Sequence, residues 1–144
     1  MKILRVILAI VAGVFIGGIV NMALVMLGSA LVPAPEGMDV TNAESVAASA
    51  HLFQPKHFVF PFLAHAIGTL AGATVAYVMA GSYRNAVAWA VGVVFFAGGI
   101  AAARMIPAPT WFVFVDLVLA YFPMAFVATK LGAAVRAGAS SHAV

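Results

Sequence analysis

The 144-residue sequence is 65% hydrophobic and only 8% charged, and its mean hydropathy is +1.15. Soluble domains carry about 25% charged residues, and small ones bury only about two-thirds of their surface, so this composition excludes a soluble globule. The net charge of +3 is small and the cations lie at the ends of apolar runs, which argues against a nucleic-acid partner. The absence of cysteine excludes disulfides and cysteine-bound metals.

Four apolar runs are long enough to cross a bilayer, since a spanning helix needs roughly 20 mostly apolar residues. They cover residues 6–32, 58–80, 86–106 and 111–131. The sequence therefore predicts an all-α integral membrane protein, in which residues 1–144 form one bundle of four transmembrane helices without a separate soluble domain.

The first run follows two cationic residues, as the apolar core of a secretion signal does. Signal cores are only about 7–15 residues long. Residues 6–32 form a much longer stretch, so we expect a retained transmembrane helix.

Two pairs of glycines predict close helix packing. Gly13 and Gly17 form a GxxxG pair in the first span, and Gly68 and Gly72 form another in the second span. Small residues let helices approach closely in lipid, where packing takes the place of the hydrophobic drive. We expect these faces to make helix contacts, including contacts between copies in a homo-oligomer or with a larger membrane complex.

The only long polar segment is the loop at residues 33–57, which holds three of the four acidic residues. Within it, Thr41-Asn42-Ala43-Glu44 has the pattern of a capping box and predicts a short helix over roughly residues 42–52. We expect this helix to lie on the extracytoplasmic membrane surface or over the mouth of the bundle.

The distribution of cations predicts the orientation of the chain, because cytoplasmic loops are enriched in Lys and Arg. One side of the bundle receives Lys2, Arg5, Arg84, Lys130 and Arg136. The other side receives Lys56 and Arg104, together with the acidic loop. We therefore expect a bacterial inner-membrane protein with both termini, including a tail over residues 132–144, in the cytoplasm.

Polar residues from all four spans share the outer half of the predicted bundle. At a rise of about 1.5 Å per residue, they lie roughly 3–15 Å from the outer ends of their helices. The inner half is almost purely apolar. We predict a ligand-binding or ion-pair cluster made of Asn21, His65, Thr69, Arg104, Asp116 and Tyr121.

Asp116 is the only acidic residue inside a span, and an acid near the centre of a membrane helix costs about 2.5–3.5 kcal/mol. Three explanations are open. Asp116 forms an ion pair with Arg104 across the turn at residues 107–109, or it works with His65 to bind an ion, exchange a proton or hold a polar headgroup. In the third explanation, its side chain simply reaches the membrane interface.

No cofactor is expected. Only one histidine, His65, is embedded, whereas bis-histidine haem needs two. His51 and His57 are weak candidates for metal ligands because no tight ligand spacing accompanies them. No set of nucleophile and base is visible, so we expect no catalytic residues.

Two further features concern the ends and the middle of the spans. Tyr121 with Pro123 predicts a kink in the fourth span. Aromatic residues at the outer ends predict an interfacial belt, made of Phe58, Phe60, Phe62, Trp111, Phe112 and Phe114.

Two classes of function fit this sequence. In the first, the protein binds or transports a small solute, ion or lipid, with Asp116 as the charged ligand or proton site, His65 as its titrating partner and Arg104 as the counter-charge. In the second, the protein is a non-catalytic accessory or assembly subunit of a larger membrane complex. An enzyme is a third and weaker alternative.

Overall fold

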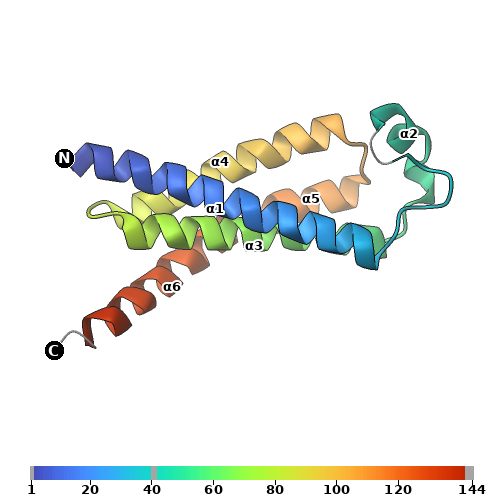
Figure 1. Ribbon diagram of the computed structural model, residues 1–144. Helices are drawn as coiled ribbons and strands as arrows, with labels where there is room; N and C mark the ends of the chain where they lie inside the picture. The colour runs from blue at the N-terminus through green and yellow to red at the C-terminus, as the bar shows by residue number, and fades with distance from the viewer. Residues whose placement is uncertain (1, 40–41, 142–144) are drawn as a thin grey trace.

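The computed structural model describes residues 2–39 and 42–141, which form an elongated bundle of helices (Figure 1). Its elements are α1 (Lys2–Leu31), α2 (Ala43–Ala48), the 3₁₀ turn η1 (Ala50–Leu52), α3 (Lys56–Met79), α4 (Arg84–Met105), α5 (Thr110–Leu119) and α6 (Phe122–Ser141). The described residues contain no strand. Four stretches are long and apolar enough to cross a membrane, namely α1, α3, α4 and Thr110–Ala139. The prediction of an all-α chain with four such helices is confirmed.

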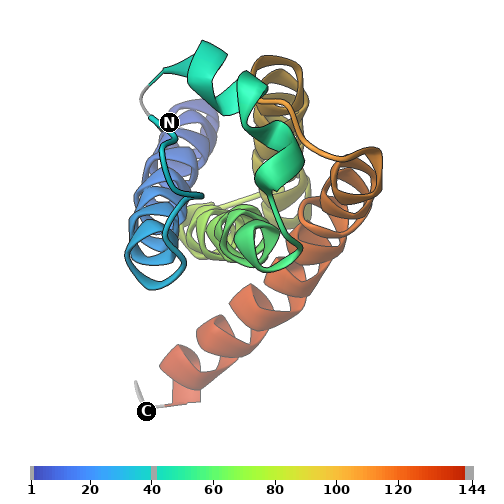
Figure 2. The ribbon, with the colours of Figure 1, turned by 90° about the vertical axis from the view of Figure 1, so that its right-hand side faces the viewer.

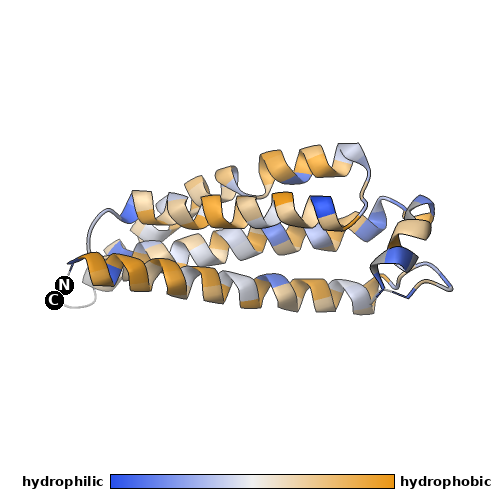
Figure 3. Cartoon of the chain, turned by 90° about the horizontal axis from the view of Figure 1, so that it is seen from above, coloured by the Kyte–Doolittle hydropathy of each residue, from blue (hydrophilic) through white to orange (hydrophobic). Residues whose placement is uncertain are grey.

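The two ends of the bundle differ in composition. The terminal end carries the start of α1, the end of α6 and the turn at residues 80–83, whereas the loop end carries residues 32–39 and 42–55 and the turn at residues 106–109 (Figure 1). Apolar residues dominate the helices along their length, and polar residues gather mainly in the connections and at helix ends (Figure 3). This distribution suits helices that border lipid along their length and reach water at both ends.

Helix α3 is the central helix (Figure 2), because it makes the most extensive contacts of all the helices, above all with α1 and α6. Small side chains build the core toward the terminal end, where Ala73, Ala76, Val91 and Ala128 are buried together. In contrast, α1 packs mainly against α3 and exposes large apolar side chains such as Phe15. Thin, alanine-rich helices therefore meet at close range inside the bundle, and the bulky side chains face outward.

The two GxxxG pairs face each other across the α1–α3 interface. A Cβ atom added at Gly13 would lie 2.5 Å from the carbonyl oxygen of Gly72, and one added at Gly17 would lie 2.6 Å from the carbonyl oxygen of Gly68. Nothing larger than glycine fits without movement of a backbone. These two faces therefore pack against each other within one chain, and contacts with a second copy or a larger complex stay a prediction.

The fourth span breaks where the kink is predicted: α5 ends at Leu119 and α6 begins at Phe122. Pro123 explains the position of the break, because proline lacks the N–H that would bond the carbonyl of Leu119, and its ring clashes with that carbonyl. The two linking residues, Ala120 and Tyr121, are buried. Beyond the break, α6 diverges from the other helices toward its C-terminal end (Figures 1 and 2).

The short helix of the polar loop exists but differs from the prediction over residues 42–52. Helix α2 is shorter, and its N-cap is Asn42, whose Oδ1 accepts hydrogen bonds from the backbone N–H groups of Glu44 and Ser45. The cap that the capping box requires, Thr41, lies outside the described residues. The connection with α2 and η1 crosses the loop end of the bundle (Figure 2).

The helix boundaries also differ from those predicted. Helix α6 continues to Ser141, so most of the expected tail over residues 132–144 is helical. Helix α3 begins at Lys56, which places Pro61 beyond the first turn. Because proline has no N–H, the carbonyl of His57 lacks its usual intrahelical donor.

Candidate functional site

Three side chains from α3, α5 and the break in the fourth span form one hydrogen-bonded group, which we call the polar cluster. The Nδ1 atom of His65 lies 2.9 Å from each carboxylate oxygen of Asp116. The hydroxyl of Tyr121 donates to Oδ2 of Asp116 at 2.9 Å. The carboxylate is therefore the centre of the polar cluster and joins α3 to α5 and to the break in the fourth span.

The polar cluster keeps a carboxylate inside the bundle. Asp116 is 4% exposed and Tyr121 is 1% exposed, whereas His65 is partly exposed. A carboxylate removed from water needs hydrogen-bond donors or an opposite charge. Its two oxygens receive them from the imidazole and the phenol, and no buried side-chain N or O atom within residues 2–39 and 42–141 lacks a partner.

His65 has a second ring nitrogen, Nε2, which is not part of the bond to Asp116. An ionised carboxylate only accepts hydrogen bonds, so Nδ1 of His65 carries the proton in its bond to Asp116. Nε2 has no partner in the described part of the chain, and it is not enclosed, because every enclosed side-chain N or O atom there has a partner. A neutral ring thus offers a lone pair at Nε2, and a protonated ring offers an N–H.

Neighbouring groups fix the orientation of the polar cluster. The hydroxyl of Thr69 donates to the backbone carbonyl of His65 at 2.7 Å. The Tyr121 ring packs against the rings of His65 and Phe96, with centroids 5.8 Å apart in both pairs. Gly99 of α4 lies against the Tyr121 ring, where any side chain would collide with the phenolic oxygen. Glycine at this position therefore lets the hydroxyl reach Asp116.

Of the six predicted cluster residues, His65, Asp116 and Tyr121 come together, and Thr69 lies behind the His65 backbone. Arg104 does not join them. It is exposed, and the carboxylate of Asp116 bonds His65 and Tyr121 instead. Of the three explanations for Asp116, the ion pair with Arg104 does not form in the structure, because the carboxylate faces α3 and not the end of α4.

Asn21 and the weak metal candidates also lie apart from the polar cluster. Asn21 packs at the α1–α3 interface, where a Cβ atom added at Gly68 would lie 3.0 Å from the Cβ atom of Asn21. His51 and His57 each use Nδ1 to bond the backbone of their own segment. In the part of the chain that is described, no group of three or more His, Cys, Asp or Glu side chains is placed to hold a metal ion.

The polar cluster borders a cavity of about 240 Å³, which we call the deep cavity. His65 and Asp116 line it. The remaining walls are mostly apolar and include Phe58, Gly99, Ala102, Ala103, Phe112 and Val113. The rings of Phe58 and Phe112 pack at a centroid distance of 4.7 Å. An apolar cavity with a few convergent polar groups is the usual composition of a small-molecule site.

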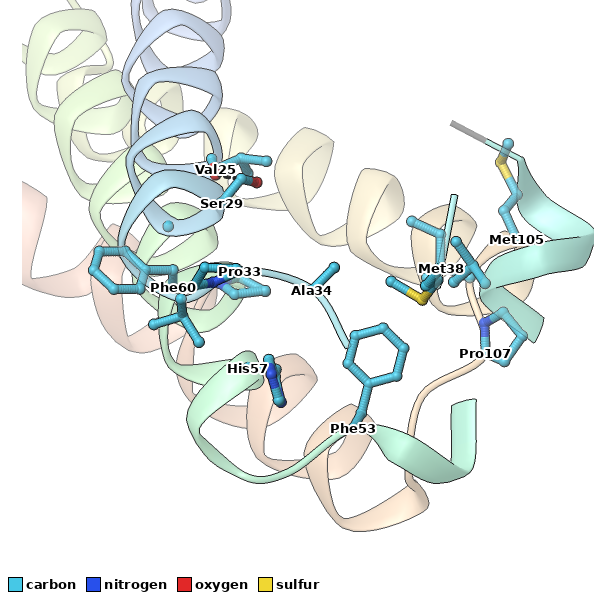
Figure 4. Close-up of a pocket in the computed structure, with 15 residues that line it drawn as sticks. Val25, Ser29, Pro33, Ala34, Met38, Phe53, His57, Phe60, Met105 and Pro107 are labelled. Carbon is cyan, nitrogen blue, oxygen red and sulfur yellow. Dashed lines mark hydrogen bonds between the residues drawn. The ribbon is translucent and has the colours of Figure 1, made fainter. Parts of the chain in front are cut away.

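A second cavity of about 600 Å³ lies at the loop end, and we call it the mouth cavity. Figure 4 shows it between α1, the segment after α1, the start of α3 and the α4–α5 turn. Phe53, His57, Pro61 and Ile106 line both cavities. The ring of Phe53 packs edge-on against that of His57 at 5.6 Å. The mouth cavity therefore adjoins the deep cavity at the loop end.

The predicted aromatic belt is only partly a belt. Trp111 and Phe114 are exposed, as interfacial aromatic residues are. Phe58 and Phe112 are instead buried and line the deep cavity. Neighbouring residues on a helix point about 100° apart, so Trp111 and Phe112 face different environments although they are adjacent in sequence.

Sequence reasoning missed the deep cavity and the role of Gly99. The available signal was the spacing of small residues in the third span. Gly99, Ala102 and Ala103 follow the i, i+3, i+4 pattern of one helix face. A helix face of such small residues either packs closely against a neighbouring helix or borders a cavity, and the sequence does not distinguish the two.

Comparison with protein-family models, with curated proteins and with solved structures finds no match to this chain. Functional inference therefore rests on the geometry of the polar cluster and the two cavities.

Proposed function

We propose that this protein binds a small, largely apolar molecule in the deep cavity, as the recognition step of transport across a membrane. The observation that carries the proposal is a bonded pair of ionisable side chains at the wall of an otherwise apolar cavity. His65 and Asp116 lie 2.9 Å apart and both line that cavity. Ionisable residues inside membrane spans are costly to insert and are functional hypotheses by default.

The volume of the deep cavity supports a ligand of about one aromatic ring with a short substituent. An apolar cavity of about 150 Å³ holds benzene, and the deep cavity measures about 240 Å³. The packed rings of Phe58 and Phe112 offer an aromatic wall. A longer ligand would extend past His57 into the mouth cavity.

The Nε2 atom of His65 suggests the polar group on the ligand. With the proton on Nδ1, a neutral ring accepts a hydrogen bond at Nε2, so a ligand hydroxyl or N–H is the matching group. One such hydrogen bond contributes about 1 kcal/mol, which is roughly fivefold in affinity. The apolar walls would supply the rest of the binding free energy.

The break in the fourth span supports transport as the purpose of binding. Interrupted helices next to a binding site are a recurring feature of transporters. Here the break carries Tyr121, whose hydroxyl bonds Asp116. A tilt of α6 against α5 would alter this hydrogen bond. Proton binding by the polar cluster would then be coupled to movement of the ligand from the deep cavity toward the terminal end.

We further propose that the loop end, with α2 and the mouth cavity, faces the outside of a bacterial inner membrane. Five of the seven Lys and Arg residues lie toward the terminal end, which supports a cytoplasmic location for both termini. The chain has no native cysteine, so single-cysteine variants are clean reporters. A membrane-impermeant maleimide should label Gln54→Cys but not Ala139→Cys in intact cells, and the reverse pattern would invert the topology.

Binding is tested with a matched pair of probes, 4-ethylphenol and ethylbenzene, which differ by one hydroxyl. A ligand that binds only the folded protein raises its unfolding temperature. In mild detergent, 4-ethylphenol should raise the unfolding temperature of the wild type more than ethylbenzene does. The Asp116→Asn variant should respond equally to both probes, because His65 loses the charge that orients its ring.

Two alanines of α4 give matched controls for the site of binding. Ala103 lines the deep cavity, whereas Ala101 is exposed. Ala103→Leu should abolish the response to both probes, and Ala101→Leu should retain it. An equal response from both variants would mean that the probes act through the detergent, and the proposal would fail. Because neutral 4-ethylphenol crosses lipid unaided, transport is tested by proton movement: adding it to proteoliposomes that enclose a pH-sensitive dye should change the luminal pH more with the wild type than with Asp116→Asn, and an equal change would contradict transport.

A further inference from the structure

A groove of about 500 Å³ at the terminal end combines cationic and apolar side chains. It is lined by Lys2, Leu4, Arg5 and Leu8 of α1 and by Gly81 and Ser82 of the α3–α4 turn. Leu4 and Leu8 lie one helical turn apart and are 60% and 54% exposed. The groove thus has two cations beside an apolar strip that follows α1 toward the middle of the bundle.

Arg5 is held in this groove before any ligand arrives. Its Nε donates to the carbonyl oxygen of Met79 at 2.9 Å, and its Nη groups have no hydrogen-bond partner in the described part of the chain. Gly81 lies under the side chain, since a Cβ atom added there would be 3.1 Å from Cδ and 3.3 Å from Nη1 of Arg5. A donor fixed in advance loses little conformational freedom on binding.

The surroundings of the groove are strongly positive. Arg84 and Arg136 donate to the carbonyls of Ala80 and Val78, so three arginines in all gather around the end of α3. The four acidic side chains of the sequence lie elsewhere, at residues 36–44 and 116. The side chains of Lys2 and Ser82 form no hydrogen bond within residues 2–39 and 42–141, so their donors are available to a ligand.

We propose that this groove binds an anionic phospholipid, with the phosphate at Lys2, Arg5 and Ser82 and an acyl chain along Leu4 and Leu8. Guanidinium and ammonium donors suit phosphate oxygens, and basic segments at a membrane surface attract anionic lipids. A free phosphate would use the same donors but would leave the apolar strip uncovered, so the exposed leucines favour the lipid. This proposal is independent of the deep cavity and of any solute.

The test is native mass spectrometry of the full chain in mild detergent with equal amounts of phosphatidylglycerol and phosphatidylcholine. Each cation near a membrane surface contributes roughly fivefold in affinity for anionic lipid. The wild type should retain one phosphatidylglycerol in preference to phosphatidylcholine, and Lys2→Gln should reduce this preference roughly fivefold. Arg5→Gln should reduce the preference for phosphatidylglycerol at least as much. If loss of the hydrogen bond from Arg5 to Met79 impairs folding, Lys2→Gln still tests the proposal.

Two variants separate a built site from general surface charge. Lys130→Gln removes an exposed cation of α6 that does not line the groove, and it should leave the preference within about twofold of the wild type. Gly81→Leu keeps every charge but fills the groove, and it should reduce the preference roughly as much as Lys2→Gln does. An equal loss in Lys130→Gln, or no loss in Gly81→Leu, would overturn the proposal. Displacement of the lipid by an equal concentration of glycerol phosphate would also overturn it, because a free phosphate would then be the ligand.

Discussion

The α1–α3 interface and the α3–α4–α5 region at the loop end use small residues for opposite purposes. At the first, Gly13 and Gly72 bring two backbones so close that a Cβ atom would lie 2.5 Å from a carbonyl oxygen. At the second, Ala102 and Ala103 of α4 line an open cavity of about 240 Å³. The difference lies in what stands opposite. Where a helix face of glycine and alanine lies against another such face, the two helices pack in direct contact. Where such a face lies opposite helices that large aromatic rings hold apart, a cavity remains.

The two regions together give a small bundle of 144 residues both stability and a binding site. Tight packing of α1 on α3 supplies contacts that need no polar group. The polar cluster can then hold a buried carboxylate, which is expensive for a membrane helix. We expect mutations in the first region to change stability most, and those in the second to change binding more than stability.

The largest effect is expected at the α1–α3 interface. Gly72→Ala should lower the free energy of unfolding by about 2–3 kcal/mol, because the new methyl group collides with the backbone of α1. Titration of the protein with a denaturing detergent measures this change. Gly18→Ala is the matched control, since nothing lies within 4 Å of a Cβ atom there. If both variants lowered the free energy of unfolding equally, close packing at Gly72 would not be what stabilises α1 against α3.

A somewhat smaller effect is expected from Asp116→Asn. The change removes the charge that accepts from both His65 and Tyr121, and hydrogen bonds to charged groups contribute about 1.5–3 kcal/mol. We expect a loss of about 2 kcal/mol in the same titration. Wild-type stability in this variant would show that the carboxylate is already neutral or unpaired.

Tyr121→Phe should cost less, about 0.6–1 kcal/mol, because it removes one hydroxyl and keeps the packing of the ring. Its stability is measured alongside that of Tyr83→Phe, a change at an exposed tyrosine. Adding Tyr121→Phe to Asp116→Asn should lower the free energy of unfolding by at most about 0.5 kcal/mol more, because the two residues share one hydrogen bond that Asp116→Asn already weakens. Full additivity would contradict that bond.

The smallest effect is expected from Arg104→Gln, which should change stability by less than about 0.5 kcal/mol. Arg104 is exposed and is not the partner of Asp116 in the structure. A loss close to that of Asp116→Asn would restore the ion pair across the α4–α5 turn. Lys56→Gln, at another exposed cation near the loop end, serves as the control.

The sequence predicted the ingredients of the polar cluster better than their pairing. Counting residues from the helix ends placed His65, Asp116 and Tyr121 in one half of the bundle, because helical rise converts position into depth. The choice between Arg104 and His65 as the partner of Asp116 depends on the rotation of α5 about its own axis. Rotation follows from side-chain packing, here from Phe112 turning inward against Phe58, and the apolar pattern of the span is too uniform to reveal it.

The sequence by itself determined that four apolar helices build this chain, where glycine permits close approach and where Pro123 interrupts the fourth span. These are local properties of length, side-chain size and the missing N–H of proline. Only the tertiary structure decided that the glycine faces close within one chain, that His65 bonds Asp116, and that a cavity lies beside them. Each of these depends on which helix stands opposite, and a helix that is apolar on all sides carries little information about its neighbours.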